Sequence, residues 1–384
     1  MKAKLVLLAL AFTSLLNADF EYRVENSNFT ISQGSINPES DKTYLYNYDR
    51  LRFRLAYTQD EFFVSIIADG VNYYGDSYVN SNDFEYVKLQ KSDTPFNTQS
   101  DYNTYESGSV YAKLYRAYAG YEDDANRVLV GLQNISMGVG RIWNPTNLFN
   151  PRNVYALEPD EIFGVFGISY TRHIDDTSQV TVVVSQKADE SLKYAVQYKA
   201  YLEIADFALD FISSNETTML GYEIEGNLGE TGVEVRSEGA YIKNKLQKNL
   251  ISTQELEFFQ GVIGTDYGFV NGITLVCEAL YSSENFSYQK ILLNYDSEIL
   301  PNLVYSKLYT ALSLSYSFNI YLDGSLTYIE SFNDKNSRYV APMLTYTLND
   351  YNSLMLGAMI QNGEEGSEFE KFANAYYLKW FLSF

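Results

Sequence analysis

The side chains that most often carry out catalysis are scarce in this chain. Its 384 residues include one histidine, His173, and one cysteine, Cys277. One histidine leaves little scope for a histidine-based metal site, and one cysteine excludes a disulfide framework, a multi-cysteine zinc site and an iron–sulfur cluster. We therefore predict that the protein is not an enzyme, has no catalytic residues, and binds neither a metal nor a cofactor.

Charged side chains recur instead at every second position of several segments. Arg50, Arg52 and Arg54 alternate with apolar residues. A set of mostly acidic residues does the same farther along the chain: Glu223, Glu225, Glu234, Arg236 and Glu238. A period of two places such charges on one face of a β-strand, and ionised groups of both signs need water or a partner. The basic row opposite a glutamate-rich wall would set up a transverse field that orients polar solutes; in the alternative interpretation, these charges only pair with neighbours.

The elements that must position these charges repeat one unit, a strand of about ten residues with alternating polar and apolar character followed by a polar connection. Eighteen strands are predicted, at 20–31, 43–57, 61–69, 109–121, 126–136, 163–173, 178–186, 192–202, 205–213, 217–227, 231–241, 254–266, 271–281, 305–317, 320–331, 337–348, 352–361 and 371–384. A soluble sandwich shows similar alternation. The number of strands, their length, and Tyr and Phe near their ends favour an all-β fold, a transmembrane antiparallel β-barrel. Sixteen strands is the alternative if 20–31 is a tail and another short segment is not a strand.

The connections between these strands differ in length in a regular way. The even-numbered ones are short, whereas the longest ones, 70–108, 137–162, 242–253 and 282–304, are all odd-numbered. Bacterial outer-membrane barrels have an even number of strands, short periplasmic turns and longer outer loops. If both termini are periplasmic, the long connections face outward. A barrel of this size is wide enough for an aqueous channel unless loops fill it.

Both ends of the chain carry signals for export and insertion. Lys2 and Lys4 precede an apolar run at 5–16 and the small residue Ala18, a pattern typical of a cleaved signal peptide. Residues 1–18 are expected to direct export through the Sec pathway, and residues 19–384 to form the barrel. The last strand resembles the C-terminal insertion signal of bacterial outer-membrane barrels. The residues of this signal are Tyr376, Leu378, Trp380, Leu382 and Phe384.

One long connection differs from the others in composition. Residues 131–161 hold three of the seven prolines and one of the two tryptophans, and Asn-Pro occurs twice, a dipeptide that favours rigid turns. A stiff, partly apolar loop is a poor solvent-exposed tip, so residues 137–162 are predicted to fold into the barrel and narrow it. The residues expected at this constriction are Arg141, Trp143, Asn144, Pro145, Asn150, Pro151 and Arg152.

The same stretch resembles a motif of large porin-like outer-membrane barrels of proteobacteria: Gly-Arg-Gln, then Trp-Gly, then Gly-Arg-x-Trp-Asn-Pro-Thr-Asp-Leu-Phe-Asn-Pro. The matching residues are Gly131, Gln133, Gly138, Gly140, Arg141, Trp143, Asn144, Pro145, Thr146, Leu148, Phe149, Asn150 and Pro151. Leu132, Met137 and Asn147 depart from the motif, which has Arg, Trp and Asp there. The resemblance covers about thirty residues and implies a porin-like protein without indicating a substrate.

Charge and composition narrow the choice of partners. The chain has 49 acidic and 28 basic side chains, which excludes a general nucleic-acid binder because phosphates require clustered Lys and Arg. The expected partners are outer-membrane lipid and lipopolysaccharide, the barrel-assembly machinery during insertion, and small solutes. The barrel is expected to be a monomer or a homotrimer.

The function predicted from these patterns is a porin-like channel in the bacterial outer membrane, for passive or selective diffusion of small polar or charged solutes. The alternative is a sealed barrel that acts as a surface scaffold, an adhesin or a partner of a periplasmic complex. Outer-membrane hydrolases need a histidine or an acidic dyad at the outer leaflet or above it. The strand at 163–173 is expected to place His173 at the periplasmic end instead.

Overall fold

The alternating segments form long antiparallel strands in the computed structural model, which describes residues 19–37, 40–332, 335–370 and 373–384. The strands are β1 (Asp19–Gly34), β2 (Thr43–Gln59), β3 (Phe62–Tyr74), β4 (Asn103–Tyr105), β5 (Gly108–Glu122), β6 (Asn126–Gln133), β7 (Val165–Asp175), β8 (Ser178–Gln186), β9 (Leu192–Tyr201), β10 (Asp206–Ser213), β11 (Thr217–Asn227), β12 (Val233–Gln247), β13 (Thr253–Gly268), β14 (Ile273–Ser282), β15 (Leu308–Asn319), β16 (Leu322–Phe332), β17 (Ser337–Asn349), β18 (Asn352–Gly363) and β19 (Ala375–Ser383).

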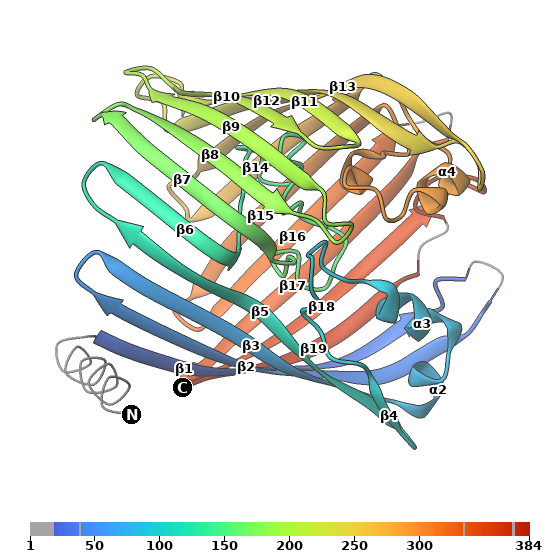
Figure 1. Ribbon diagram of the computed structural model, residues 1–384. Coiled ribbons are helices and arrows are strands. Elements are labelled where there is room, and N and C mark those ends of the chain that lie inside the picture. Colours follow the sequence, from blue (N-terminus) through green and yellow to red (C-terminus); the bar gives the residue numbers. More distant parts are fainter. Residues whose placement is uncertain (1–18, 38–39, 333–334, 371–372) are drawn as a thin grey trace.

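The helices are short and lie in the long connections (Figure 1). They are α2 (Asp76–Val79), α3 (Asn82–Leu89), α4 (Tyr288–Leu293) and the 3-10 helix η2 (Leu300–Asn302). Among the described residues, no helix is both long enough and apolar enough to span a membrane.

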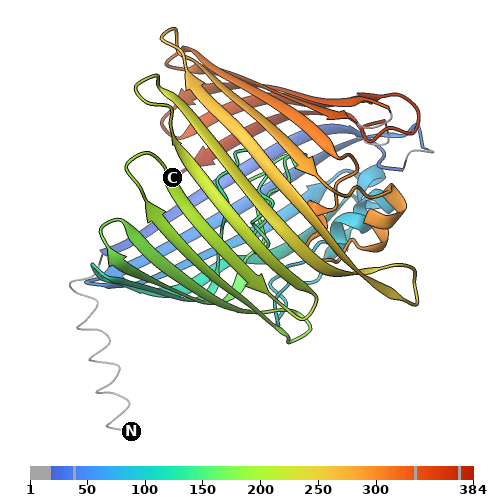
Figure 2. The ribbon, with the colours of Figure 1, turned by 90° about the horizontal axis from the view of Figure 1, so that it is seen from above.

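The strands close into one barrel. Each strand of the wall pairs with its neighbours in chain order, and β1 pairs with both β2 and β19. The three-residue β4 pairs with β5, while β3 pairs with β5 directly, so β4 belongs to the long connection rather than to the closed wall. The wall therefore has eighteen strands (Figures 1 and 2), which confirms the predicted fold class and strand number. The predicted signal peptide, residues 1–18, lies outside the described residues.

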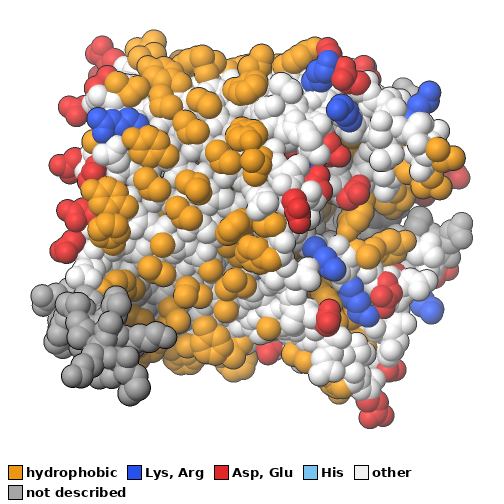
Figure 3. Space-filling view, viewed as in Figure 1, with side chains coloured by type: hydrophobic (Ala, Val, Ile, Leu, Met, Phe, Trp, Pro, Cys, Tyr) orange, Lys and Arg blue, Asp and Glu red, His pale blue; other side chains and the backbone are white. Residues whose placement is uncertain are grey.

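The two ends of the barrel differ in the length of their connections. Turns such as 60–61, 123–125 and 320–321 occupy the end where Phe384 lies, and the connections 75–107, 134–164 and 283–307 leave from the other end (Figure 1). On the face drawn in Figure 3, hydrophobic side chains gather on the wall between two ends that carry charged side chains. This arrangement matches the length asymmetry predicted from the sequence.

One predicted long connection is wrong. Residues 242–253 are not a loop, because β12 and β13 continue in register up to the pair Gln247 and Thr253 and leave only the turn 248–252. The alternation continues there in the opposite sense to that of a lipid-facing strand, because Ile242 and Leu246 point inward and are buried while the outward side chains are polar. On the outer face Lys243 Nζ lies 2.6 Å from Glu255 and 3.0 Å from Glu257, so cross-strand ion pairs replace apolar contacts.

The long connections pack into the barrel in two apolar clusters. The first cluster joins Tyr78 and Phe84 of the 75–107 connection to wall residues such as Phe29, Tyr309 and Tyr339. The second joins residues of the 134–164 and 283–307 connections to strands β8 to β13. Its loop members are Ile135, Met137, Leu148, Phe149, Phe286, Ile299 and Leu303. Loops therefore occupy a large share of the interior toward the end that carries the long connections.

Candidate functional site

The connection between β6 and β7, residues 134–164, crosses the inside of the barrel (Figure 2). We call this segment the strap. Two buried asparagines hold its fold: Asn150 Oδ1 accepts a hydrogen bond from the Ile135 amide at 2.5 Å, and Asn147 Nδ2 donates to the Asn150 carbonyl at 2.8 Å. Asn302, from another long connection, donates to the Pro145 carbonyl at 3.1 Å. These contacts pair buried polar groups of the strap with one another and with a neighbouring connection, and so give it a defined shape.

The first half of the strap is held by three glutamates, which we call the acidic wall: Glu223 on β11, Glu238 on β12 and Glu278 on β14. Glu238 accepts from the amides of Val139 at 2.6 Å and Gly140 at 2.8 Å, and from the amide of Thr146 at 3.3 Å. These contacts are charge-assisted hydrogen bonds to backbone N–H groups, which are stronger than neutral ones.

The flanking glutamates extend this contact along the strap. Glu223 accepts from the Gly138 amide at 2.5 Å. Glu278 accepts from the amides of Arg141 at 2.5 Å and Ile142 at 2.9 Å. A run of consecutive N–H groups thus faces carboxylates from three strands, so the acidic wall binds the strap through its backbone.

Gly138 makes this close approach sterically feasible. Its φ of 95° lies in the left-handed region that favours glycine. A Cβ at this position would also lie 2.8 Å from Glu238 Oε2 and 2.9 Å from Thr146 Oγ1. A side chain at residue 138 would therefore push the strap away from the acidic wall.

The second half of the strap is held by the opposite charge. We call Arg50 and Arg52 on β2 and Lys379 on β19 the basic wall. Glu158 lies 2.8 Å from both Arg50 Nη1 and Lys379 Nζ. Glu161 lies 2.7 Å from Arg52 Nη2. Burial opposes ionisation of Glu161, but the hydrogen bond from Arg52 and the charges of both arginines hold the pKa of this carboxyl below its usual value.

The arginine row of the sequence is therefore largely compensated. Arg52 also contacts Asp69 at 2.7 Å, with both side chains almost fully buried. Arg54 differs from the other two, because it is 38% exposed and shares Glu25, at 2.9 Å, with Arg23. This geometry agrees with the interpretation that the charges pair with neighbours.

A second charged cluster stays open to solvent on the side of the strap that faces the short turns. The Arg141 guanidinium lies 2.8 Å from Glu225, 2.6 Å from Glu234 and 3.3 Å from Asp266, with 46% of the side chain exposed. Arg236, in contrast, is fully buried and contacts Glu234, Asp266 and Glu278. A cavity of about 560 Å³ adjoins Arg141, Glu225 and Glu234.

The residues predicted for the constriction divide into two groups. Asn144, Pro145, Asn150 and Pro151 shape the strap, and Trp143 packs against Tyr309 with ring centroids 5.9 Å apart. Arg141 and Arg152 are the charged members; Arg152 lies 2.7 Å from Asp160 and donates to the Arg141 carbonyl at 2.8 Å. Of the predicted lumen charges, the structure brings Glu223, Glu225, Glu234, Arg236 and Glu238 together around the first half of the strap and places Arg50, Arg52 and Arg54 on the opposite wall.

Sequence reasoning missed the strap's own acids, Glu158 and Glu161, and their partner Lys379. A loop that folds inward against a row of arginines needs carboxylates to pair with them. That requirement could have pointed to the two glutamates. The alternation of the last strand placed Lys379 on the inner face, but nothing in the sequence joined it to residue 158.

The remaining residues singled out in the sequence lie away from the strap. Tyr376, Leu378, Trp380 and Phe384 are exposed on the outer wall, and Leu382 is half-buried there. His173 is exposed near the turn 176–177, at the end with short turns. Among the described residues, no group of three or more His, Cys, Asp or Glu is arranged to hold a metal ion.

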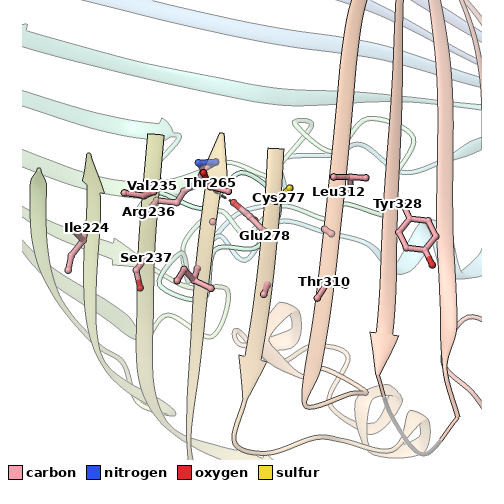
Figure 4. Close-up of a pocket in the computed structure, with 14 residues that line it drawn as sticks. Ile224, Val235, Arg236, Ser237, Thr265, Cys277, Glu278, Thr310, Leu312 and Tyr328 are labelled. Carbon is pink, nitrogen blue, oxygen red and sulfur yellow. Dashed lines mark hydrogen bonds and ion pairs between the residues drawn. The ribbon is translucent and has the colours of Figure 1, made fainter. Parts of the chain in front are cut away.

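A groove of about 800 Å³ lies across strands β11 to β16 (Figure 4). Most of its lining faces outward, as Ser237, Cys277 and Leu312 do, and the strand positions next to these, Arg236, Glu278 and Ala311, also border it. Its lining is mostly apolar or small.

A closed eighteen-stranded barrel with an apolar outer wall and an inward loop is the fold of outer-membrane porins. Among solved structures, the chain is similar to OccAB1 of Acinetobacter baumannii, with a TM-score of 0.61 and 10% identity over 97% of both chains. It is also similar to OpdK of Pseudomonas aeruginosa, solved with vanillate, with a TM-score of 0.59 and 10% identity over 95% of this chain and 98% of that chain. The chain is also similar to OccAB3 of A. baumannii, with a TM-score of 0.57 and 12% identity over 95% of this chain and 99% of that chain.

These likenesses establish a shared fold. They agree with the porin-like resemblance of the sequence at the level of the barrel. No protein-family model matches the chain, and no curated protein sequence matches it.

Proposed function

We propose that the protein is an outer-membrane channel for small polar or charged solutes, with the strap as its constriction. The observation that carries the proposal is that one loop crosses the interior and is fixed to opposite walls by opposite charges. The outer membrane protein OpdK, which shares the fold, was solved with the small aromatic acid vanillate. That likeness supports a channel for small solutes.

Selectivity would come from charges that remain exposed. Arg23 and Arg54 share one carboxylate, Glu25. On the opposite wall, the exposed cation Arg141 lies among three carboxylates, those of Glu225, Glu234 and Asp266. A solute below the strap would thus meet an excess of positive charge on one side and of negative charge on the other, which favours polar and charged molecules over apolar ones.

A sealed barrel is the second candidate, and the two apolar clusters favour it. Tyr78, Phe84 and Phe286 from the long connections pack into the interior, and such packing excludes water. A sealed barrel would act as a scaffold, an adhesin or a partner of a periplasmic complex.

Planar-bilayer recording of the purified protein separates the two candidates. A channel gives discrete ion-conducting steps, and a variant that lacks residues 141–152 gives larger steps. The control is Glu257→Gln, because Glu257 pairs with Lys243 on the outer face and lies away from the strap. Folding of every variant is checked by heat-modifiable mobility on gels. Absence of conductance from folded wild-type protein would reject the channel and support the sealed barrel.

We also infer that the barrel is inserted into the outer membrane after Sec export, with Tyr376, Leu378, Trp380, Leu382 and Phe384 as its insertion signal. The outward position of these residues supports this inference. Outer-membrane lipid, lipopolysaccharide and the barrel-assembly machinery are the partners this implies, whether the barrel is a monomer or a homotrimer.

A further inference from the structure

Three carboxyl groups lie side by side in the lumen wall beneath the strap. Asp210 on β10, Glu223 on β11 and Glu238 on β12 are 3%, 4% and 0% exposed. Glu223 and Glu238 are direct cross-strand partners, an arrangement that is destabilising when both groups are ionised. Lys199 on β9 pairs with Ala208, two positions from Asp210 on β10, and within the described residues no ion pair joins it to Asp210 or Glu223.

Glu238 is stabilised by the strap amides, but Asp210 and Glu223 are not stabilised to the same degree. The Gln197 side-chain amide on β9 donates to Asp210 Oδ1 at 2.8 Å and to Glu223 Oε1 at 3.3 Å. Glu223 Oε1 also accepts from the Gly138 amide. Asp210 Oδ2 is buried and has no hydrogen-bond donor among the described residues. A buried carboxylate oxygen without a donor is costly.

The geometry offers one partner for that oxygen. Asp210 and Glu223 lie on adjacent strands, and one donor, the Gln197 side-chain amide, reaches both carboxyl groups, so the two groups are neighbours. Two carboxylates cannot hydrogen-bond, because each only accepts; a carboxylic acid and a carboxylate can, because the acid donates its O–H. Two carboxyl groups that share a site do not ionise together.

We propose that Asp210 and Glu223 share one proton, and that this proton fixes the first anchor of the strap. The shared proton holds Glu223 beside Asp210, with Oε1 directed at Gly138. The other groups that face the pair are Lys199 from β9 and Glu238 from β12, while the strap presents Gly138 and Thr146, which are uncharged. Loss of the proton to hydroxide leaves two adjacent negative charges next to Glu238.

Deprotonation therefore drives the two carboxylates apart. Asp210 moves toward Lys199, and Glu223 moves away from the Gly138 amide. The strap loosens at its start, and the conductance of the channel rises. This last consequence rests on the proposed function, whereas the shared proton does not.

The experiment combines infrared spectroscopy with bilayer recording over a series of pH values. The wild-type protein is expected to show the C=O stretch of one protonated carboxyl from this pair at neutral pH, and to lose it at alkaline pH. Asp210→Asn and Glu223→Gln should each abolish this C=O stretch while the barrel stays folded. The control Glu257→Gln should leave it in place. In the same pH interval the conductance of the wild type should rise, and that of Asp210→Asn should stay constant.

Two outcomes overturn the proposal. One is a protonated-carboxyl signal that both folded variants retain, and the other is the absence of any such signal from the wild type at neutral pH. A wild-type protein that shows the signal but no conductance at any pH would refute the proposed channel and leave the shared proton supported. If Asp210→Asn does not fold, Glu223→Gln, which keeps nearly the same shape, decides the question.

Discussion

Replacement of Glu238 by alanine should detach the strap without unfolding the barrel. Glu238 is fully buried and accepts hydrogen bonds from the amides of Val139, Gly140 and Thr146 and from the Thr146 hydroxyl. Alanine offers none of these donors an acceptor. The pairing of β12 with both neighbouring strands uses backbone atoms only and remains intact.

The size of the effect follows from the number of orphaned donors. A buried N–H group that loses its partner costs about 1–3 kcal/mol. Water that enters the space left by the carboxylate keeps each cost near the lower end, so three amides give a loss of about 3 kcal/mol. Since 1.4 kcal/mol corresponds to a factor of ten, the open form of the strap should become roughly 100-fold more populated. The wall itself should not weaken, because the substitution also removes the charge opposite Glu223.

Hydrogen exchange measured by mass spectrometry on peptides that cover 138–146 tests this directly. The expected result is a fall of about two orders of magnitude in protection of the strap, with unchanged protection of β12 and β13. Glu257→Ala is the control, because Glu257 contacts Tyr241 and Lys243 on the exposed outer face. Unchanged protection of the strap in folded Glu238→Ala protein would refute the claim that the acidic wall holds it.

Three further predictions concern other parts of the chain. Arg52→Met leaves Asp69 buried without its cation and should cost about 3–5 kcal/mol, seen as a lower urea midpoint, whereas Arg54→Met should cost less than about 1 kcal/mol because Arg54 is exposed. Burial raises the pKa of Glu368 to about 7. The folded protein therefore favours the neutral acid, so its stability should fall as the pH rises from 4.5 through about 7. Glu368→Gln should abolish this pH dependence, as measured by thermal unfolding. Leu378→Arg puts a charge on the outer wall and should reduce the free energy of folding into lipid by up to about 2–4 kcal/mol, measured by denaturant titration in vesicles; an unchanged value would show that this position does not face lipid.

The barrel could be predicted from the sequence because its signal is periodic and local. Polar and apolar residues alternate along the strands of the wall, so a strand can be recognised from its own residues. The short turns divide the chain at regular intervals. The prediction failed at 242–253, where Lys243 and Glu255 make the outer face polar and the apolar residues Ile242 and Leu246 point inward. This part of the hairpin packs its apolar face against the inward-folded loops, so its pattern is the reverse of that in a strand whose apolar face meets lipid.

The site could be predicted only in outline. Composition placed the strap inside the barrel, and periodicity placed Arg50 and Glu238 on the inner face. The contacts themselves join residues far apart in sequence, such as Arg50 and Glu158, which are 108 positions apart. Backbone amides also do much of the binding, and no sequence pattern reveals which carboxylate a backbone N–H group will meet. The strap's partners therefore follow from the tertiary fold alone.

The arrangement of the two walls changes what the charged rows mean for selectivity. A row of free arginines would attract anions directly, but Arg50 and Arg52 are buried against Glu158 and Glu161 and position the strap. Substitutions in this buried set should alter the width of the constriction for all solutes alike. Selection between solutes of different charge must then depend on groups that stay exposed, above all Arg141. Neutralising Arg141 should shift the reversal potential in a salt gradient toward cation preference, because it leaves the surrounding carboxylates uncompensated.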